Sequence, residues 1–374
     1  MPPPNRCDTH THSERGHPSF FVAVSGEWEG CCISINGTSG SKLELPELYV
    51  PEAYREWGKK VYDWQTQTSC LVRDGTFRRL CKRLMPTVGC EADAVAFEED
   101  SASVPLDLTG PLIPGADGSY VLAPLALSSL NSLKVVMEHC LPCDVSSSGT
   151  SDTAMQSRFR VEHELRNWTT KPLGWSLDRV HVYHEEYEGP FNGGTELFAC
   201  GAGSRLLSNK RTTQKDDLFG ATSSSSSSST STSSLWSIDR RELYERSAGG
   251  SSSPHPSMVL TSSETAGVTS VWSDEEQQGL LLLPGGVYSM FAVDKEAKTM
   301  TIVAGMVEAA GSMQTIPFPP EEGEENEEGG SLHGPLKMTI SRRVYQLEEK
   351  MNDGDDNDAY LLRQEFLWLS RDSV

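Results

Sequence analysis

The chain has 374 residues, of which 37% are hydrophobic and 23% charged. At about 150 residues per domain, this length favours two domains. Lys and Arg number 32 against 53 Asp and Glu, which gives a formal net charge of −21 at pH 7. A chain this acidic, with no basic stripe, is not expected to bind nucleic acid. No apolar run approaches the ~18 residues that a membrane span needs.

The start of the chain and the cysteines bear on whether the protein is secreted or targeted to an organelle. Residues 1–18 are polar, rich in Pro and His and without an apolar core, so they predict a disordered tail and neither a secretory signal nor a convincing transit peptide. The 9 cysteines are an odd count at irregular spacing, which argues against a secreted disulfide framework. Cys140 and Cys143 form a C-x-x-C motif with no second pair beside it. We interpret both as structural thiols, with a redox pair or a metal site as the alternatives.

From residue 19 to residue 203 the pattern is period-2 alternation or short apolar runs, broken by Gly, Pro, Ser and Asp, which is typical of β-strands. A short helix is expected at Pro51–Trp57, where Pro opens the first turn. Many short strands in so short a stretch predict an antiparallel β-barrel over 19–203. The expected strands are Glu27–Ile35, Lys60–Leu71, Phe77–Pro86, Ala92–Phe97, Gly118–Ala123, Leu133–His139, Ser157–Leu165, Trp175–Glu186 and Thr195–Cys200.

Residues 204–257 are dominated by serine and cannot bury enough apolar area to offset chain entropy, so they predict a flexible linker or insertion. A short strand is expected inside it, at Leu235–Ile238. From 258 to 374 strand patterns resume and predict a second, smaller barrel, with acidic turns at Glu321–Glu328 and Asn352–Asp358. Its expected strands are Met258–Thr261, Gly267–Ser273, Gly279–Leu283, Val287–Val293, Thr299–Glu308, Leu336–Gln346 and Tyr360–Ser370.

Two clusters could carry chemistry. His181 and His184 are three residues apart in a strand-like segment, which places them on opposite faces, so we expect no shared metal ion and one of them lining the barrel lumen. Cys90, Glu91 and Asp93 join a thiol to two carboxylates; we interpret them as a polar turn at a barrel mouth, with acid–base chemistry as the alternative. The sequence contains no G-x-S-x-G elbow, P-loop or dinucleotide fingerprint, so no catalytic residue is assigned.

Gly26-Glu27-Trp28 opens the first expected strand. A G-x-W at this position is the short hallmark of lipocalin-like barrels, where the Trp packs across the closed end and an Arg from a late strand covers its face. We therefore assign Trp28 a structural role. Further along, Tyr62 and Trp64 are expected on one face of a strand, and Gln65 and Gln67 on the other.

Several segments resemble a known family. They are Ser25–Gly30, Leu45–Trp57, Val61–Gln67, Leu84–Asp93, Glu188–Gly193, Leu281–Pro284, Val307–Glu308 and Ser341–Gln346. They are similar to an uncharacterised family of plants and green algae with lipocalin-like (calycin) domains, and more distantly to the cyanobacterial calycins that attach bilins to phycobiliproteins. The resemblance implies a plastid location, in place of an otherwise cytoplasmic one, and a barrel that holds a hydrophobic or tetrapyrrole ligand.

The sequence therefore predicts an all-β protein with two lipocalin-like antiparallel barrels joined by a Ser-rich linker. We expect a soluble, non-enzymatic binding or assembly protein with a small hydrophobic or tetrapyrrole-like ligand and no metal. The alternatives are a bilin-lyase-like or isomerase-like enzyme, in which Cys90, Glu91 or Asp93 assists, and an interaction scaffold with filled barrels. The expected ligand-binding residues are Tyr62, Trp64, Gln65, Gln67, Cys90, Glu91 and His181.

Overall fold

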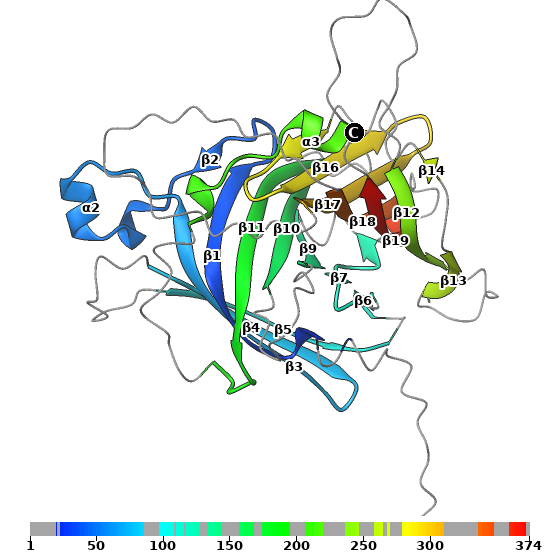
Figure 1. Ribbon diagram of the computed structural model, residues 1–374, viewed down its shortest axis with the longest axis horizontal. Coiled ribbons are helices and arrows are strands. Elements are labelled where there is room, and N and C mark those ends of the chain that lie inside the picture. The colour runs from blue at the N-terminus through cyan, green and yellow to red at the C-terminus, as the bar shows by residue number, and fades with distance from the viewer. Residues whose placement is uncertain are drawn as a thin grey trace, which may run out of the picture.

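The computed structural model describes residues 20, 23–85, 97–107, 110–115, 117–127, 133–143, 157–167, 174–194, 206–219, 236–246, 258–264, 268–269, 279–309, 336–347 and 359–371. Strands account for 67% of these residues and helix for 9%, and the strands form two antiparallel sheets (Figure 1). The first sheet nearly closes into a barrel, and the second forms a half-barrel. The predicted all-β class with two barrel-like sheets is confirmed.

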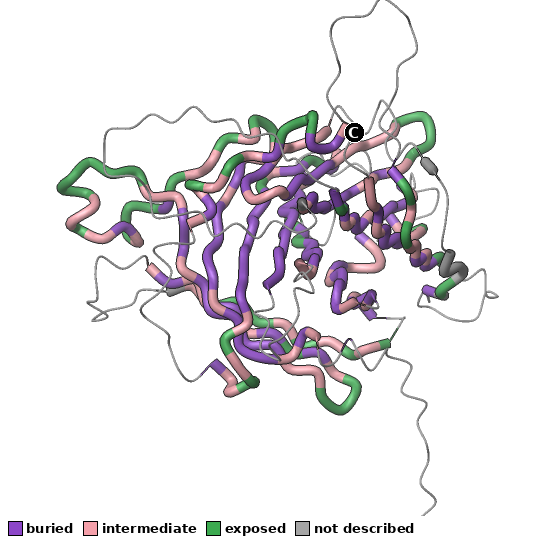
Figure 2. The backbone as a smooth tube through the Cα atoms, viewed as in Figure 1, coloured by how far each residue is buried: buried purple, intermediate pink, exposed green. Residues whose placement is uncertain are grey.

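The first sheet has the strand order β5-β4-β3-β1-β11-β10-β9-β7-β6, with β2 added to β1. Its long central strands alternate side chains between two buried faces, which is why most of their residues are buried (Figure 2). Its strands are β1 (Gly26–Asn36), β2 (Lys42–Leu43), β3 (Asp63–Arg73), β4 (Thr76–Leu84), β5 (Phe97–Pro105), β6 (Leu112–Pro114), β7 (Tyr120–Leu122), β9 (Lys134–Pro142), β10 (Ser157–Asn167) and β11 (Trp175–Gly189).

The second sheet has the order β13-β12-β19-β18-β17-β16-β15, with β14 on β12 and β8 on β19. Its strands are β8 (Ala126–Leu127), β12 (Trp236–Arg246), β13 (Met258–Glu264), β14 (Val268–Thr269), β15 (Leu280–Leu282), β16 (Val287–Asp294), β17 (Thr299–Ala309), β18 (Leu336–Leu347) and β19 (Ala359–Arg371). Helical turns are η1 (Glu47–Tyr49), α2 (Glu52–Glu56), η4 (Leu207–Asn209) and α3 (Lys215–Phe219).

Two strands cross the domain limits expected from the sequence. β8 belongs to the first half of the chain but pairs with β19, and β12 lies within the Ser-rich stretch 204–257 but is a full strand of the second sheet. Residues 123–125 connect β7 of the first sheet to β8, which pairs in the second. The division of the chain at residues 203 and 257 stays a prediction.

The two sheets pack face to face through one apolar core. Residues on the outer face of the first sheet, such as Ile33 and Val182, pack against residues on the facing side of the second, such as Ile302 and Tyr345. Hydrogen bonds tie the crossing segment down: the Tyr345 hydroxyl donates to the carbonyl of Pro124 at 2.6 Å, and the Leu361 amide donates to the carbonyl of Leu125 at 2.7 Å. The inner faces of the two sheets therefore point away from the shared core.

Candidate binding site inside the first barrel

The inner face of the first barrel is built by alternation along β10. Arg158, Arg160 and Glu162 point inward, while the residues between them, among them Phe159 and Val161, join the shared core. β4, β9 and β11 add further charged side chains from around the barrel. The interior thus contains three arginines and three glutamates, all buried: Arg79, Arg158, Arg160, Glu138, Glu162 and Glu185.

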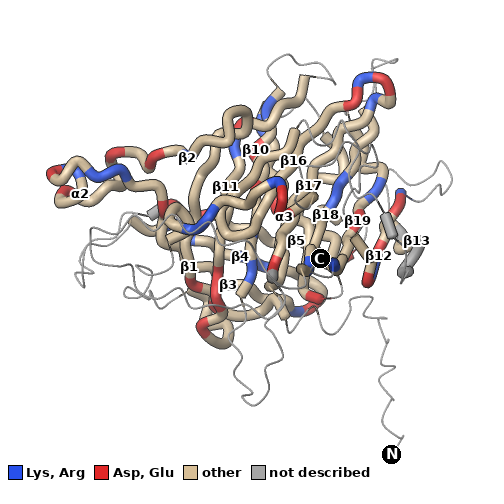
Figure 3. Tube along the Cα trace, turned by 45° about the horizontal axis from the view of Figure 1, so that its top comes forward, with Lys and Arg blue, Asp and Glu red and all other residues tan. Residues whose placement is uncertain are grey.

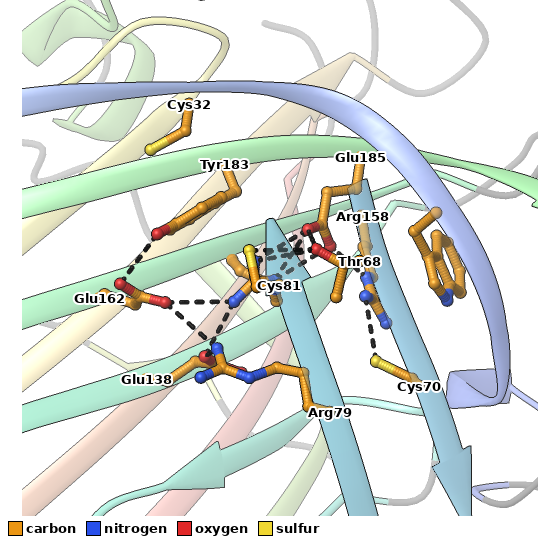
Figure 4. A network of polar contacts seen from close by, with 12 residues as sticks. Cys32, Thr68, Cys70, Arg79, Cys81, Glu138, Arg158, Glu162, Tyr183 and Glu185 are labelled. Atoms are coloured by element: carbon orange, nitrogen blue, oxygen red, sulfur yellow. Dashed lines mark hydrogen bonds and ion pairs between the residues drawn. The ribbon is translucent and has the colours of Figure 1, made fainter. Parts of the chain in front are cut away.

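Glu185 is the carboxylate at the centre of this network (Figure 4). Its oxygens accept hydrogen bonds from Arg158 Nε at 2.7 Å and from Arg160 Nη2 at 2.9 Å. The Thr68 hydroxyl, from the strand across the barrel, donates to the same carboxylate at 2.6 Å. Short charge-assisted bonds of this kind are the strong class of protein hydrogen bond, so Glu185 ties β3 to β10 and β11.

The remaining charges close the network on the opposite wall. Arg79 forms ion pairs with Glu138 and, at 3.2 Å, with Glu162. Arg160 Nη1 reaches the same two carboxylates, at 2.8 and 3.2 Å. Two tyrosine hydroxyls complete the shell, Tyr120 donating to Glu138 at 2.6 Å and Tyr183 to Glu162 at 3.0 Å. These six side chains match one another in charge, Arg79 pairs in addition with Asp100, and Arg83, whose charge also acts on Glu162, pairs with Glu98 at 3.5 Å.

Electrostatics favour the ionised form of two glutamates in the network, Glu185 and Glu162. Although burial alone would raise it, the Arg160 and Arg158 guanidinium groups hold the pKa of Glu185 well below its usual range. The pKa of Glu162 is likewise lowered, against the effect of burial, by Arg79 and Arg160. Burial raises the pKa of the Tyr183 hydroxyl, which keeps it protonated. None of these three groups is set to exchange a proton near neutral pH, which general acid–base catalysis would require.

Trp28 lies on the inner face at one end of the network, where it packs with Phe20, Phe77 and Tyr120 and is 2% exposed. The Arg158 guanidinium stacks 3.9 Å from the centre of its ring, and the Tyr187 ring meets it edge-on at 5.5 Å. The indole nitrogen donates to the carbonyl of Val24 at 3.3 Å. An Arg covering the Trp of a G-x-W motif is the contact that the resemblance implied.

The other end of the network meets a layer of mainly aromatic side chains, which we call the aromatic mouth: Tyr49, Tyr54, Trp64 and Tyr183, with the aliphatic Val61. The rings of Trp64 and Tyr49 are 4.7 Å apart. Tyr49 and Tyr54 come from the η1–α2 segment, which projects from this end of the barrel and carries charges of both signs (Figures 1 and 3). Its Leu48 and Trp57 are exposed, at 79% and 60%.

The expected ligand-binding residues divide between the two faces of the barrel wall. Trp64 and His181 face inward at the aromatic mouth, where His181 Nδ1 shares a 2.9 Å hydrogen bond with the Ser34 hydroxyl. Gln65 and Gln67 lie on the outer face, because they alternate with Trp64 along β3. Tyr62 precedes β3 and is half-buried.

Cys90 and Glu91 lie outside the described residues, as does Asp93, so their roles stay predictions. His184, in contrast to His181, lies on the outer face beside Phe159, with 4.7 Å between ring centres. The two histidines therefore do not share a ligand.

The C-x-x-C motif does not form a paired site. Cys140 points into the barrel interior among aromatic residues, and Cys143 faces the sulfur of Met306 in the second sheet at 3.8 Å. Burial raises the pKa of the Cys140 thiol to about 12 and that of the Cys143 thiol well above its ordinary value. Since the thiolate is the reactive form, both are poor nucleophiles and poor metal ligands at neutral pH.

The described residues contain no group of three or more His, Cys, Asp or Glu side chains arranged to hold a metal ion. Among the same residues, no helix has the length and apolarity that a transmembrane helix requires.

The charged network itself was missed by sequence reasoning. The signal lies in β10, where Arg158, Arg160, Glu162, Glu164 and Arg166 recur at every second position between apolar residues. Such a pattern ordinarily indicates a strand with one solvated face. The mixture of signs within one face is the feature that a self-paired interior requires.

Comparison with known proteins adds little to this geometry. No protein-family model matches the chain, and no curated protein matches it. A solved crystal structure of a protein from Nitrosomonas europaea, assigned as AttH, aligns over 91% of this chain and 92% of its own, with 9% identity and a TM-score of 0.18. A likeness at that TM-score supports no argument about fold or function.

Proposed function

We propose that the protein is a non-enzymatic binding protein that holds a small hydrophobic molecule at the aromatic mouth of the first barrel. Ligand pockets in proteins are lined mainly by apolar and aromatic side chains with a few placed polar groups, and they occur in the mouths of β-barrels. The aromatic mouth has this composition, with Trp64 and Tyr183 as walls and His181 beside them. A planar tetrapyrrole is the ligand class that the family resemblance adds to this proposal.

One observation carries the proposal. The hydroxyl of Thr66, two residues from Trp64 on the same inner face, is buried and makes no hydrogen bond within the described part of the chain. An unsatisfied buried hydroxyl costs about 1–3 kcal/mol, so a ligand with one polar atom among its apolar ones would gain that hydrogen bond. The ligand would enter where Tyr49 and Tyr54 of the η1–α2 segment cover Trp64.

The interior below the mouth supports a binding role over a catalytic one. The ionised Arg–Glu network forms a fixed floor, in which Glu185 and Glu162 are held as carboxylates by neighbouring arginines. A fixed floor orients a ligand but does not exchange protons with it.

The first test is native mass spectrometry with an absorbance spectrum on protein purified gently from its source. A bound mass of several hundred daltons, or a visible chromophore, supports the proposal. Binding is then measured on the recombinant chain with two probes, 1-anilinonaphthalene-8-sulfonate and protoporphyrin IX. Trp64→Ala is expected to weaken binding about tenfold or more, as loss of a central aromatic contact does.

Two further variants make this test specific. Thr66→Val keeps the shape of the side chain and removes only the hydroxyl, so a folded variant with weakened binding of a polar-tipped probe supports contact at this position. Trp236→Phe changes a buried Trp on the inner face of the second sheet and is the matched control. If Trp236→Phe weakens binding and Trp64→Ala does not, the site lies in the second sheet and the proposal is wrong.

A scaffold without a ligand is the second candidate, and the filled interior of the first barrel favours it. Arg79 and Arg160 reach Glu138 from opposite walls, so side chains occupy the centre of the lumen. An apo mass for the native protein, together with no probe binding by the wild-type chain, would favour the scaffold. Co-purified proteins would then be identified.

A further inference from the structure

Two buried histidines join the sheets across the shared core. His139 of β9 and His163 of β10 are both fully buried, with their rings 5.1 Å apart and nearly perpendicular. Each shares a hydrogen bond with a serine of the second sheet: His139 Nδ1 with Ser341 Oγ at 2.9 Å, and His163 Nε2 with Ser289 Oγ at 2.7 Å. The Nε2 atom of His139 has no hydrogen-bond partner in the described residues, whereas the backbone of Met137 and Val303 lies close to the His163 ring and favours its charged form.

The hydrogen bonds accommodate a neutral His139. Gln364 Nε2 donates to Ser341 Oγ at 3.1 Å, which leaves the serine proton free to go to His139 Nδ1. With Nδ1 as the acceptor the ring is neutral, and a proton added to Nδ1 would require the Ser341 hydroxyl to turn its own proton away from the ring.

No described hydrogen bond or ion pair offers a carboxylate to a protonated ring. Among the described residues around the pair, β9, β10, β16 and β17 contribute apolar side chains or Ser289, and β19 contributes Gln364. β18 contributes Tyr345, a neutral phenol, and Arg343, a fully buried cation bonded to the carbonyls of residues 123 and 124 and to the Tyr345 hydroxyl. The titratable groups further along the same face act on other partners: Glu308 of β17 on Cys143, Asp63 and Glu186 on Cys31, while His184 of β11 contacts Phe159.

We propose that the contact between the two sheets is acid-labile, and that protonation of His139 and His163 separates the face of β9 and β10 from the face of β16 and β18. Each added proton would place a second or third positive charge near Arg343, and neither ring forms a described hydrogen bond or ion pair with a carboxylate. Burying an unpaired charge is costly. The histidine pair lies outside the aromatic mouth, and its effect does not depend on the proposed ligand.

The pKa values agree with this geometry. Burial lowers the pKa of His163 to about 4, and burial together with the charges of His163 and Arg343 lowers that of His139 well below its ordinary value. An unfolded histidine titrates near pH ~6.5. The contribution of the neutral rings is therefore fully present above that pH and is lost as pH falls from there toward 4.

The first barrel stays closed over the same range. Glu185 and Glu162, whose pKa values are lowered by their arginine partners, remain ionised in mildly acidic solution, so the interior network is intact when the histidines become charged. Opening of the interface can thus be told apart from unfolding of the barrel.

Thiol labelling of the full chain tests the proposal, because cysteines report on both places. Cys143 lies at the interface, against Met306 of the second sheet, whereas Cys70 and Cys140 are buried inside the first barrel. The protein is treated with 4,4′-dithiodipyridine between pH 7.5 and 4.5, and each cysteine is followed by mass spectrometry. Rates are divided by those of a cysteine peptide at the same pH.

In the wild-type chain, we expect the normalised rate at Cys143 to rise about tenfold or more between pH 7 and pH 5, with Cys70 and Cys140 still protected. His139→Asn and His163→Gln each keep the hydrogen-bonding atom at the place of the ring nitrogen and cannot be protonated. The double variant is expected to show no rise. Lys60→Gln, which removes an exposed cation outside the interface, is the control and should respond as the wild type does.

Three results would overturn the proposal. One is a wild-type rate at Cys143 that does not change with pH. Another is simultaneous labelling of Cys70 and Cys140, which would mean that the barrel unfolds as a whole. The third is a wild-type rise in the rate at Cys143 that persists both in a folded single variant and in the double variant. If the double variant does not fold, the NMR titration of the wild-type imidazole signals decides: buried rings that charge above pH 6.5 without opening contradict the mechanism.

Discussion

Glu185→Gln is the substitution that most directly tests the interior of the first barrel. It leaves the size of the side chain unchanged and removes its charge, so Arg158 and Arg160 lose the carboxylate they share at 2.7 and 2.9 Å. The new amide group would also place its N–H donors against the N–H donors of the two guanidinium groups. Three arginines would then face two glutamates in a buried site, and breaking a buried ion pair in this way costs about 3–5 kcal/mol. A protein of ordinary stability, ~5–15 kcal/mol, would lose about a fifth of it or more.

Urea unfolding followed by circular dichroism measures this loss, with wild type and variant compared at pH 7. Lys60→Gln is the control, because it breaks an ion pair with Glu44 in which the two side chains are 67% and 49% exposed. Solvent screens such pairs, so we expect no measurable change. A loss below ~1 kcal/mol for Glu185→Gln would refute the buried network, since that is what an exposed pair gives.

Three further predictions follow from the same interior. Trp28→Ala removes a buried indole and its stacking with Arg158, and should lower the free energy of unfolding by about 3–5 kcal/mol; a loss below 1 kcal/mol in a urea titration would place Trp28 outside the core. The lowered pKa of Glu185 means that its stabilising effect is present above the unfolded carboxyl pKa of ~4.3 and is lost as pH falls below it, so acid titrations by circular dichroism should show barrel unfolding below pH ~4.5, distinct from the earlier interface step. Cys140, with its pKa raised to about 12, should resist iodoacetamide at pH 8 in the native chain and react in urea; reaction in the native chain would contradict its burial.

Alternation along the sequence was enough to predict most strands, because a strand buried on at least one face shows its period directly. β1, β3, β10 and β11 lie close to their expected positions, as do the long strands of the second sheet. β5 was displaced: the expected strand Ala92–Phe97 ends where the observed one, Phe97–Pro105, begins. Its polar stretch of Glu, Asp and Ser lacks the apolar positions by which alternation is recognised.

The site was harder to predict, because alternation does not say which face is the inside. In β10 the charged residues looked like a solvated face, yet they form the interior, and the apolar residues face the second sheet. Only the presence of that second sheet decides this, and its strands come from far along the chain. For the same reason Gln65 and Gln67, chosen as polar groups for a pocket, lie on the outer wall, whereas Trp64 and His181 lie inside.

Charged and polar groups have different roles in three parts of this molecule. The paired charges inside the first barrel hold its walls together and stay ionised over a wide pH range, because each carboxylate touches a guanidinium. The aromatic mouth lies above them and carries an unsatisfied hydroxyl, which is the requirement of a binding site. In the shared core the two buried histidines bond serines and no described carboxylate, and Arg343 adds a positive charge, so the proposed pH-sensitive step lies in the contact between the sheets. A ligand at the mouth and a proton at the interface would therefore act on different parts of the fold, so acid should separate the sheets without releasing the ligand.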